Sequence, residues 1–180
     1  MKLVILDRDG VINKDSTNFI KNTNEWIPLP GSLEAIALLN QSGFHVAIAT
    51  NQSGIGRGLF DMATLNAIND KMYRALAQLG GRIDAMFYCP HTADDDCNCR
   101  KPKTGMIEDI GRRFSVDLVD VYAIGDSLRD LKSFSDAGCK PILVRSGKGE
   151  ETIAHGGLPK GTLIFTDLNE AVQHIIAEDE

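Results

Sequence analysis

Short runs rich in valine, isoleucine and leucine alternate with longer amphipathic stretches along the 180 residues of this chain. The short runs barely alternate between apolar and polar residues, which is typical of parallel strands that are covered on both faces. Strands that alternate with helical patterns predict a doubly wound α/β sheet. We expect strands at residues 3–6, 44–50, 83–89, 121–125, 141–144 and 163–165, and helices at residues 32–40, 61–79, 105–114, 128–137 and 168–177.

The composition is that of an ordinary globular protein, and we expect residues 1–180 to form one domain. A formal net charge of -6 argues against a broad nucleic-acid-binding surface. No apolar run is long enough to span a bilayer, and the start of the chain becomes acidic too soon for a signal peptide. The sequence therefore predicts a cytoplasmic protein without nucleic-acid or membrane partners.

The first apolar run ends in the sequence Asp7-Arg8-Asp9-Gly10. Side chains two residues apart on an extended segment point the same way, so these two carboxylates crowd one space. They repel each other unless a cation lies between them, and Mg²⁺ prefers carboxylate, carbonyl and phosphate oxygens. One carboxylate could then attack a phosphorus atom while the other handles the proton of the leaving alcohol.

Two further segments carry groups that suit a phosphate. Thr50 ends the second apolar run and precedes the glycine-rich residues 51–58, a pattern equally well explained by a turn with a capping serine. Arg100 and Lys101 form a basic pair before a proline, although an isolated basic pair is most often solvated. Because ligands collect at the carboxyl ends of parallel strands, we expect these groups to lie near Asp7.

A third acidic group follows the fourth apolar run, which ends in Gly125-Asp126-Ser127. Asp126 can reach the same cation as Asp7 and Asp9. Asp130 lies one helical turn further along the chain and could orient the site. The alternative is that Asp130 is an exposed carboxylate in the first turn of a helix, where the helix dipole favours it.

Together and in this order, these elements resemble the haloacid dehalogenase (HAD) superfamily of phosphohydrolases. The resemblance implies that Asp7 is the nucleophile and forms an aspartyl-phosphate, and that Asp9 is the general acid and then the general base. It implies that Thr50 and Lys101 hold the phosphoryl oxygens. It also implies Mg²⁺ bound by Asp7, Asp126 and the backbone carbonyl of Asp9. The expected strands and helices fill the intervals between these residues and leave no room for a separate cap domain.

Three thiols and an imidazole occur within one short segment: Cys89, His91, Cys97 and Cys99. This donor set predicts a closed, tetrahedral and therefore structural Zn²⁺ site. The alternative is a Cys97–Cys99 disulfide, which would be strained and unusual in a reducing compartment. We expect the zinc loop, residues 89–99, to fix the position of Arg100 and Lys101.

Within the superfamily, the zinc loop, the Thr50–Ile55 motif followed by Arg57 and Gly58, and the Arg-Lys-Pro sequence resemble the heptose bisphosphate phosphatases. The resemblance implies a monomer that removes the 7-phosphate from D-glycero-D-manno-heptose 1,7-bisphosphate. The product, heptose 1-phosphate, leads to nucleotide-activated heptose for lipopolysaccharide core. Arg57 is a further candidate phosphate partner. The implied substrate-binding residues are Asp15, Ser16, Thr17, Asn18, Thr50, Asn51, Gln52, Ser53, Arg100 and Lys101.

The match to that family has two departures: Thr104 stands where proline is frequent, and Ser127 stands where lysine is frequent. Three other hypotheses remain at this point. A histidinol-phosphate phosphatase shares the fold, the nucleophile and a similar zinc loop, but usually differs at the Thr50 motif. A receiver-type signalling domain would carry its phospho-acceptor on a middle strand. A zinc-stabilised binding module without catalysis would not need the site formed by the Asp7-Asp9 pair, Thr50, Lys101 and Asp126.

Overall fold

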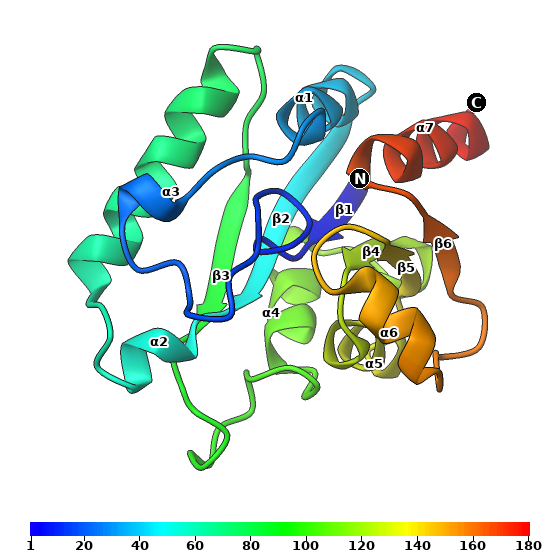
Figure 1. Cartoon of the computed structure of the whole chain (residues 1–180). Coiled ribbons are helices and arrows are strands. Elements are labelled where there is room, and N and C mark those ends of the chain that lie inside the picture. The colour runs from blue at the N-terminus through cyan, green and yellow to red at the C-terminus, as the bar shows by residue number, and fades with distance from the viewer.

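The sheet has the strand order β3-β2-β1-β4-β5-β6, and each strand runs parallel to its neighbours. The computed structural model describes all 180 residues (Figure 1). The strands are β1 (Lys2–Leu6), β2 (Phe44–Asn51), β3 (Ala85–Cys89), β4 (Tyr122–Gly125), β5 (Lys140–Val144) and β6 (Leu163–Phe165). The α-helices are α1 (Ser32–Gln41), α2 (Ser53–Gly56), α3 (Met62–Ala77), α4 (Gly105–Phe114), α5 (Leu128–Asp136), α6 (Gly149–His155) and α7 (Leu168–Asp179). The 3-10 helices are η1 (Thr23–Glu25) and η2 (Leu118–Asp120).

The chain builds this sheet outward from β1 in two directions. It passes from β1 to β2 and β3 on one side, and then returns to the other side of β1 for β4, β5 and β6. Doubly wound sheets bind ligands in the crevice at such a reversal, outside the carboxyl ends of the strands. Asp7 directly follows β1 and Asp126 directly follows β4. The fold therefore places both carboxylates at this crevice.

Alternate residues of the central strands pack into two hydrophobic clusters, one on each face of the sheet. Val4 and Val46 belong to the cluster that α1, α3 and α7 cover. Leu3 and Ala47 belong to the cluster that α4 and α5 cover. Because both faces are buried, the strands consist of continuous apolar runs, as the sequence predicts.

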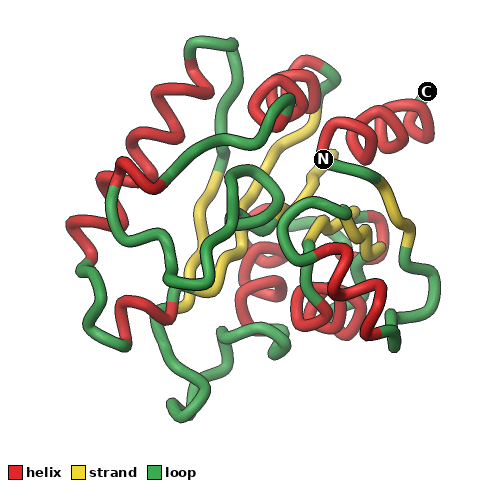
Figure 2. The backbone as a smooth tube through the Cα atoms, in the orientation of Figure 1, coloured by secondary structure: helices red, strands yellow, loops and turns green.

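The connections that follow β1 and β3 are long loops, as Figure 2 shows. The first contains a polar, irregular segment, residues 13–28, which we call the flap. Ile20 and Trp26 bury their side chains in the core. Lys71 of α3 donates hydrogen bonds from Nζ to the carbonyl oxygens of Thr23 (2.6 Å) and Trp26 (2.8 Å). These contacts attach the flap to α3.

The doubly wound sheet is confirmed, and each expected strand and helix is present with small changes at its ends. No separate cap domain interrupts the order of elements. The sequence does not predict α2 or α6, because a four-residue and a seven-residue helix are too short to show helical periodicity. None of the seven α-helices combines the length and the apolar character that crossing a membrane requires.

Candidate active site

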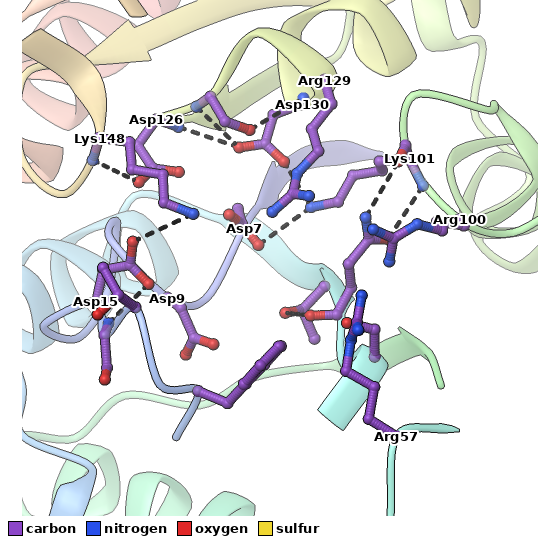
Figure 3. A pocket seen from close by; sticks show the side chains of 17 residues that line it. Asp7, Asp9, Asp15, Arg57, Arg100, Lys101, Asp126, Arg129, Asp130 and Lys148 are labelled. Carbon is purple, nitrogen blue, oxygen red and sulfur yellow. Dashed lines mark hydrogen bonds and ion pairs between the residues drawn. The ribbon is translucent and has the colours of Figure 1, made fainter. Parts of the chain in front are cut away.

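A polar cavity of about 240 Å³ lies at the carboxyl edge of the sheet (Figure 3). Of the predicted site residues, the cavity is lined by Asp7, Asp9, Asp15, Ser16, Thr17, Thr50, Asn51, Ser53, Arg100, Lys101 and Asp126. Two residues predicted to bind substrate, Asn18 and Gln52, do not line it. The other lining residues are Phe19, Arg57, Ser127, Arg129, Asp130 and Lys148.

A fully buried ion pair forms the floor of the cavity. Nζ of Lys101 lies 3.1 Å from Oδ1 of Asp7, 2.7 Å from Oδ1 of Asp130 and 2.7 Å from the carbonyl oxygen of Ala49. Burial opposes the charge of Lys101, but Asp130 and Asp7 raise its pKa above the ordinary value. Lys101 therefore supplies a fixed positive charge next to Asp7, although the two residues are 94 positions apart in the chain.

The two oxygens of Asp7 have different surroundings. Oδ1 accepts hydrogen bonds from the backbone N–H of Arg8 (2.8 Å) and from Nζ of Lys101 (3.1 Å). Oδ2 accepts no hydrogen bond from the protein. Burial and the charge of Asp130 raise the pKa of Asp7 to about 7, while Lys101 acts in the opposite direction. Asp7 thus offers one anchored oxygen and one free oxygen.

Asp126 is enclosed by two loops that must come very close to it. A Cβ atom at Gly10 would lie 2.0 Å from Oδ2 of Asp126, and a Cβ atom at Gly147 would lie 2.3 Å from the same oxygen. Both glycines have positive φ angles, which residues with a side chain rarely adopt. The backbone N–H of Lys148 donates to Oδ2 of Asp126 at 2.9 Å. Glycine is therefore required at both positions for the carboxylate to fit.

Asp130 is buried, with 1% of its surface exposed, so the hypothesis of an exposed first-turn carboxylate is wrong. Its Oδ2 accepts from the backbone N–H groups of Asp126 and Ser127, both at 3.2 Å, and its Oδ1 contacts Lys101. The Ser127 hydroxyl in turn accepts from the backbone N–H of Asp130, which completes a capping box at the start of α5. Burial opposes ionisation, but Lys101 lowers the pKa of Asp130 to about 2. These contacts fix Asp130 against Asp126, Ser127 and Lys101.

The carboxylates around the cavity fit a divalent cation. Ligand oxygens of Asp7, Asp126 and Asp130 all lie within 4.8 Å of one another. Burial and the charges of Asp130 and Asp7 raise the pKa of Asp126 well above its ordinary value. A hard cation bound to these oxygens would remove that repulsion, and Mg²⁺ suits such donors. Since Asp130 already bonds Lys101 and two N–H groups, Asp7 and Asp126 are the carboxylates with oxygens to spare.

Asp9 is held by donors on every side. Its Oδ1 accepts from Nε of Arg8 (2.8 Å) and from Nδ2 of Asn13 (3.0 Å). Its Oδ2 accepts from Nη2 of Arg8 and from Nε2 of Gln52, both at 3.3 Å. Arg8 is completely buried and also donates to Oδ1 of Asn69 in α3 (3.4 Å). Burial opposes ionisation, but Arg8 lowers the pKa of Asp9 below its ordinary value.

Asn51 joins the end of β2 to the segment that carries Lys101. Its Nδ2 donates to the carbonyl oxygen of Lys101 (3.1 Å), and its Oδ1 accepts from the backbone N–H of Lys101 (3.0 Å). This amide therefore pairs with the backbone of Lys101 as a neighbouring strand would. The position of the Lys101 side chain depends on this pair as well as on its own contacts with Asp7 and Asp130.

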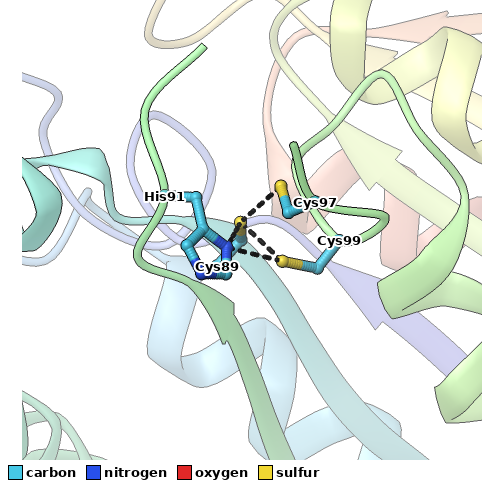
Figure 4. A group of neighbouring side chains, drawn as sticks. All are labelled: Cys89, His91, Cys97 and Cys99. Carbon is cyan, nitrogen blue, oxygen red and sulfur yellow. Dashed lines mark hydrogen bonds between the residues drawn. The ribbon is translucent and has the colours of Figure 1, made fainter. Parts of the chain in front are cut away.

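The four predicted zinc ligands converge (Figure 4). Nδ1 of His91 lies 3.4 Å from Sγ of Cys89 and 3.3 Å from Sγ of Cys99, and Sγ of Cys89 lies 3.9 Å from Sγ of Cys97. These separations are close to the edges of a zinc tetrahedron built from bonds of about 2.0–2.3 Å. The contact between Cys89 and Cys99 is shorter, at 2.7 Å. All four cysteines of the chain are free, so the alternative of a Cys97–Cys99 disulfide is not formed.

The chemistry of these thiols also fits a metal site. Burial and the neighbouring Cys99 raise the pKa of Cys89 to about 12, whereas backbone N–H groups of Arg100 and Cys99 outweigh burial and lower the pKa of Cys97 to about 7. Zn²⁺ binds cysteines as thiolates, so metal binding at this cluster would release their protons and remove the crowding of protonated thiols. Nη1 of Arg100 donates to the carbonyl oxygen of His91 at 3.3 Å. The loop is therefore bonded to a side chain that lines the cavity.

Two cations at the cavity were missed by sequence reasoning. Arg129 in α5 and Lys148 after β5 both line the cavity, and Nζ of Lys148 lies 3.6 Å from Oδ2 of Asp15. The signal for Lys148 was the sequence Ser146-Gly147-Lys148, which follows an apolar run and so lies at the carboxyl edge of the sheet. Arg129 had no such signal, because it lies inside a helical pattern.

Arg57, Arg100 and Arg129 line the cavity (Figure 3). Because Arg57 and Arg129 are exposed and Arg100 is half-buried, they lie on its solvent side, which we call the mouth. None of the three forms an ion pair with a carboxylate. Burial and the positive charges of Arg129 and Arg57 lower the pKa of Arg100. The mouth therefore has unneutralised positive charge, while the floor has an excess of carboxylates.

The fold and the site define a hydrolase of the HAD type, with an aspartate after β1, a threonine at the end of β2, a buried lysine and a second acidic pair after β4. A family model described as polynucleotide kinase 3 phosphatase matches residues 2–133, and one described as HAD-hydrolase-like matches residues 98–171. The first match contains Asp7, Thr50, Lys101 and Asp126.

Curated relatives point to one family within this class of hydrolases. The chain is 60% identical over 178 residues to D-glycero-beta-D-manno-heptose-1,7-bisphosphate 7-phosphatase from Bordetella bronchiseptica, covering 99% of each chain. It is 50% identical to the protein of the same name from Neisseria meningitidis serogroup A, covering 99% of this chain and 97% of that protein. The chain belongs to the family of D-glycero-beta-D-manno-heptose-1,7-bisphosphate 7-phosphatases. Among the hypotheses drawn from the sequence, this membership favours a heptose bisphosphate phosphatase over a histidinol-phosphate phosphatase, a receiver domain or a non-catalytic zinc module.

Solved structures agree with this assignment. The B. bronchiseptica D,D-heptose 1,7-bisphosphate phosphatase, complexed with magnesium and phosphate, has a TM-score of 0.98 at 60% identity and 99% coverage of both chains. The D,D-heptose 1,7-bisphosphate phosphatase from Burkholderia thailandensis has a TM-score of 0.79 at 50% identity, covering 98% of this chain and 99% of that chain.

Proposed function

We propose that this chain hydrolyses the 7-phosphate of D-glycero-beta-D-manno-heptose 1,7-bisphosphate and releases heptose 1-phosphate and inorganic phosphate. The names of relatives that are 50–60% identical over nearly the whole chain support the substrate. The surroundings of the Asp7 carboxylate are the observation that supports the reaction. Lys101 and the backbone N–H of Arg8 hold one of its oxygens, while the other has no hydrogen bond from the protein. A free, fixed carboxylate oxygen in a polar cavity is suited to attack a phosphorus atom.

In the first step, the free oxygen of Asp7 forms a bond to phosphorus, and the bond between phosphorus and the C7 oxygen breaks. The leaving oxygen takes its proton from Asp9, so the sugar departs as an alcohol and the phosphoryl group remains on Asp7. Lys101 and the Thr50 hydroxyl hold the phosphoryl oxygens during this transfer. Their contribution is positioning and charge neutralisation, which dominate catalysis of phosphoryl transfer.

In the second step, a water molecule attacks the phosphorus atom of the aspartyl-phosphate, and Asp9 takes a proton from that water. The acyl phosphate bond breaks, phosphate leaves and Asp7 returns as a carboxylate. Asp9 must give up a proton in one step and accept one in the other, which is the usual behaviour of a shared acid and base. The lowered pKa of Asp9 favours the base form in which the second step begins.

The proposal also includes two bound metal ions. Asp7, Asp126 and the backbone carbonyl of Asp9 would hold Mg²⁺, which would neutralise negative charge on the transferring phosphate. Cys89 and its three partner ligands would hold a structural Zn²⁺ that fixes the loop leading to Arg100. The fit of both sites rests on the crowded oxygens and on the four converging sulfur and nitrogen atoms.

Substrate contacts beyond the reacting phosphate come from the cavity wall. Asp15, Ser16 and Thr17 of the flap line one side and can accept and donate hydrogen bonds to sugar hydroxyls. Arg57 and Arg100 at the mouth provide cations for the 1-phosphate, which is not hydrolysed. Ser53 also lines the cavity and can contribute a hydroxyl.

A comparison of substrates tests the proposal. Purified protein with Mg²⁺ is assayed for kcat/KM on the α and β anomers of heptose 1,7-bisphosphate and on histidinol phosphate, with the site of phosphate loss determined by ³¹P NMR. We expect loss of the 7-phosphate only and a preference for the β anomer. A preference for histidinol phosphate, or loss of the 1-phosphate, would overturn the proposed substrate.

A further inference from the structure

The side chain of Gln52 is turned away from the cavity and joins two groups of the proposed reaction. It is 3% exposed, and its Nε2 lies 2.9 Å from Oγ1 of Thr50 and 3.3 Å from Oδ2 of Asp9. A primary amide nitrogen carries two hydrogens, so Gln52 can donate one to each of these atoms. Residues on both sides of Gln52 in the chain line the cavity, but Gln52 does not.

We propose that Gln52 is a positioning residue that fixes the Thr50 hydroxyl and the Asp9 carboxylate for phosphoryl transfer and does not itself touch the substrate. This inference rests on the proposed phosphatase activity. It differs from the role that the Thr50 motif implies, in which Gln52 is one of the substrate-binding residues.

The contact with Thr50 determines the direction of a hydrogen atom. Because Oγ1 of Thr50 accepts from Gln52, the single hydrogen of that hydroxyl must point elsewhere. Its one acceptor in the protein is the carbonyl oxygen of Asn51, at the long distance of 3.4 Å. A phosphoryl oxygen in the cavity is a stronger acceptor than this carbonyl. Gln52 therefore prepares Thr50 to donate to phosphate.

The contact with Asp9 completes a set of four donors. Oδ2 accepts from Gln52 and Arg8, while Oδ1 accepts from Arg8 and Asn13. Four bonds from three residues hold the side chain in one orientation. Gln52 is the only one of these three donor residues that also contacts Thr50. It therefore fixes the acid/base group relative to a group that holds the phosphate.

The backbone of Gln52 is itself fixed by the sheet edge. Its N–H donates to the carbonyl oxygen of Cys89 at 2.7 Å, and its carbonyl oxygen accepts from the N–H of Ile55 at 3.2 Å. Cys89 ends β3 and belongs to the predicted zinc site, while Ile55 lies in α2. The backbone of Gln52 is thus held between the end of a strand and the start of a helix. This gives its side chain the rigid support that positioning requires.

The substitution Gln52→Glu tests the proposal, because it keeps the shape of the side chain and replaces the donor by an acceptor. The new carboxylate would accept the Thr50 hydrogen and repel Asp9, so we expect kcat to fall by about 10²-fold, the usual effect of a misplacement near 1 Å. KM should stay within about threefold, since no substrate contact is lost. Gln52→Leu introduces no buried charge, and we expect its kcat to fall by about tenfold, the factor that corresponds to one hydrogen bond. If Gln52→Glu does not fold, the kcat and KM of Gln52→Leu test the proposal instead.

The matched control is Gln41→Glu, the same change at an exposed position in the last turn of α1. Its kcat and KM should equal those of the unchanged protein. Each variant is assayed on heptose 1,7-bisphosphate and on p-nitrophenyl phosphate, so the test remains valid if the chain is a phosphatase with another natural substrate. A rise in KM with unchanged kcat would show that Gln52 binds substrate and would overturn the proposal. Unchanged kcat and KM in both Gln52 variants would also overturn it.

Discussion

The paired hydrogen bonds of Asn51 predict that one side chain outside the reacting groups controls the position of Lys101. The substitution Asn51→Leu keeps a similar volume and removes both bonds to the backbone of Lys101. Asn40 provides a matched control at the other end of β2. Its Nδ2 donates to the carbonyl oxygen of Phe44 (3.3 Å), and its Oδ1 accepts from the backbone N–H of Arg82 (2.8 Å).

The expected loss of stability is the same for the two variants. A hydrogen bond contributes about 0.5–1.5 kcal/mol to folding, so the loss of two bonds lowers the free energy of unfolding by about 1–3 kcal/mol. For a chain of this length, each kcal/mol corresponds to roughly 2–4 °C in the thermal midpoint. We therefore expect Asn51→Leu and Asn40→Leu each to melt several degrees below the unchanged protein at fixed Mg²⁺ and Zn²⁺ concentrations.

The expected loss of activity is different for the two variants. Freed from Asn51, the backbone of Lys101 can shift, and Nζ loses its fixed place 3.1 Å from Asp7. A displacement of about 1 Å can lower the rate by about 10²-fold, so we expect kcat/KM of Asn51→Leu to fall by roughly 10–100-fold. The kcat/KM of Asn40→Leu should stay within about twofold of that of the unchanged protein. Equal activity in the two variants would refute the role of Asn51, as would an unchanged melting temperature of Asn51→Leu.

Three further predictions concern the proposed reaction and the zinc loop. Asp7→Asn should abolish turnover while the fold and zinc content remain, and substantial remaining hydrolysis of substrate would reject the aspartyl-phosphate mechanism. Asp9→Asn should lower kcat by about 10²–10⁴-fold, the usual contribution of an acid/base group, and a rate within threefold of the unchanged enzyme would assign proton transfer to another group. Cys97→Ser should lower both the bound zinc measured by atomic emission and kcat/KM. If zinc and activity both survived this change, the loop would not support Arg100 through a metal.

The fold could be predicted from the sequence because its signals are local. Each strand is a continuous apolar run, and the intervening helices of nine residues or more repeat their apolar residues at helical spacing. Parallel strands also explain why Asp7, Thr50 and Asp126 meet, since each directly follows or ends a strand and all carboxyl ends lie at one edge. The short helices α2 and α6 had no comparable signal and emerged only from the structure.

Other features depend on contacts between residues that are far apart in the chain, and local patterns do not encode these contacts. The burial of Asp130 against Lys101 could not be distinguished in the sequence from a solvated carboxylate at a helix start. The approach of Arg129 and Lys148 to the cavity depends on how α5 and the loop after β5 pack.

The sequence by itself determined the sheet, the class of chemistry and the donor types of two candidate metal sites, because these follow from residue type and short-range order. Only the tertiary structure decided which way each polar side chain points. The motif around Thr50 supplies two amides in a row, yet Asn51 pairs with the backbone of Lys101 and Gln52 turns inward to Asp9 and Thr50. That difference arises because neighbouring side chains leave an extended segment in opposite directions and meet different partners there.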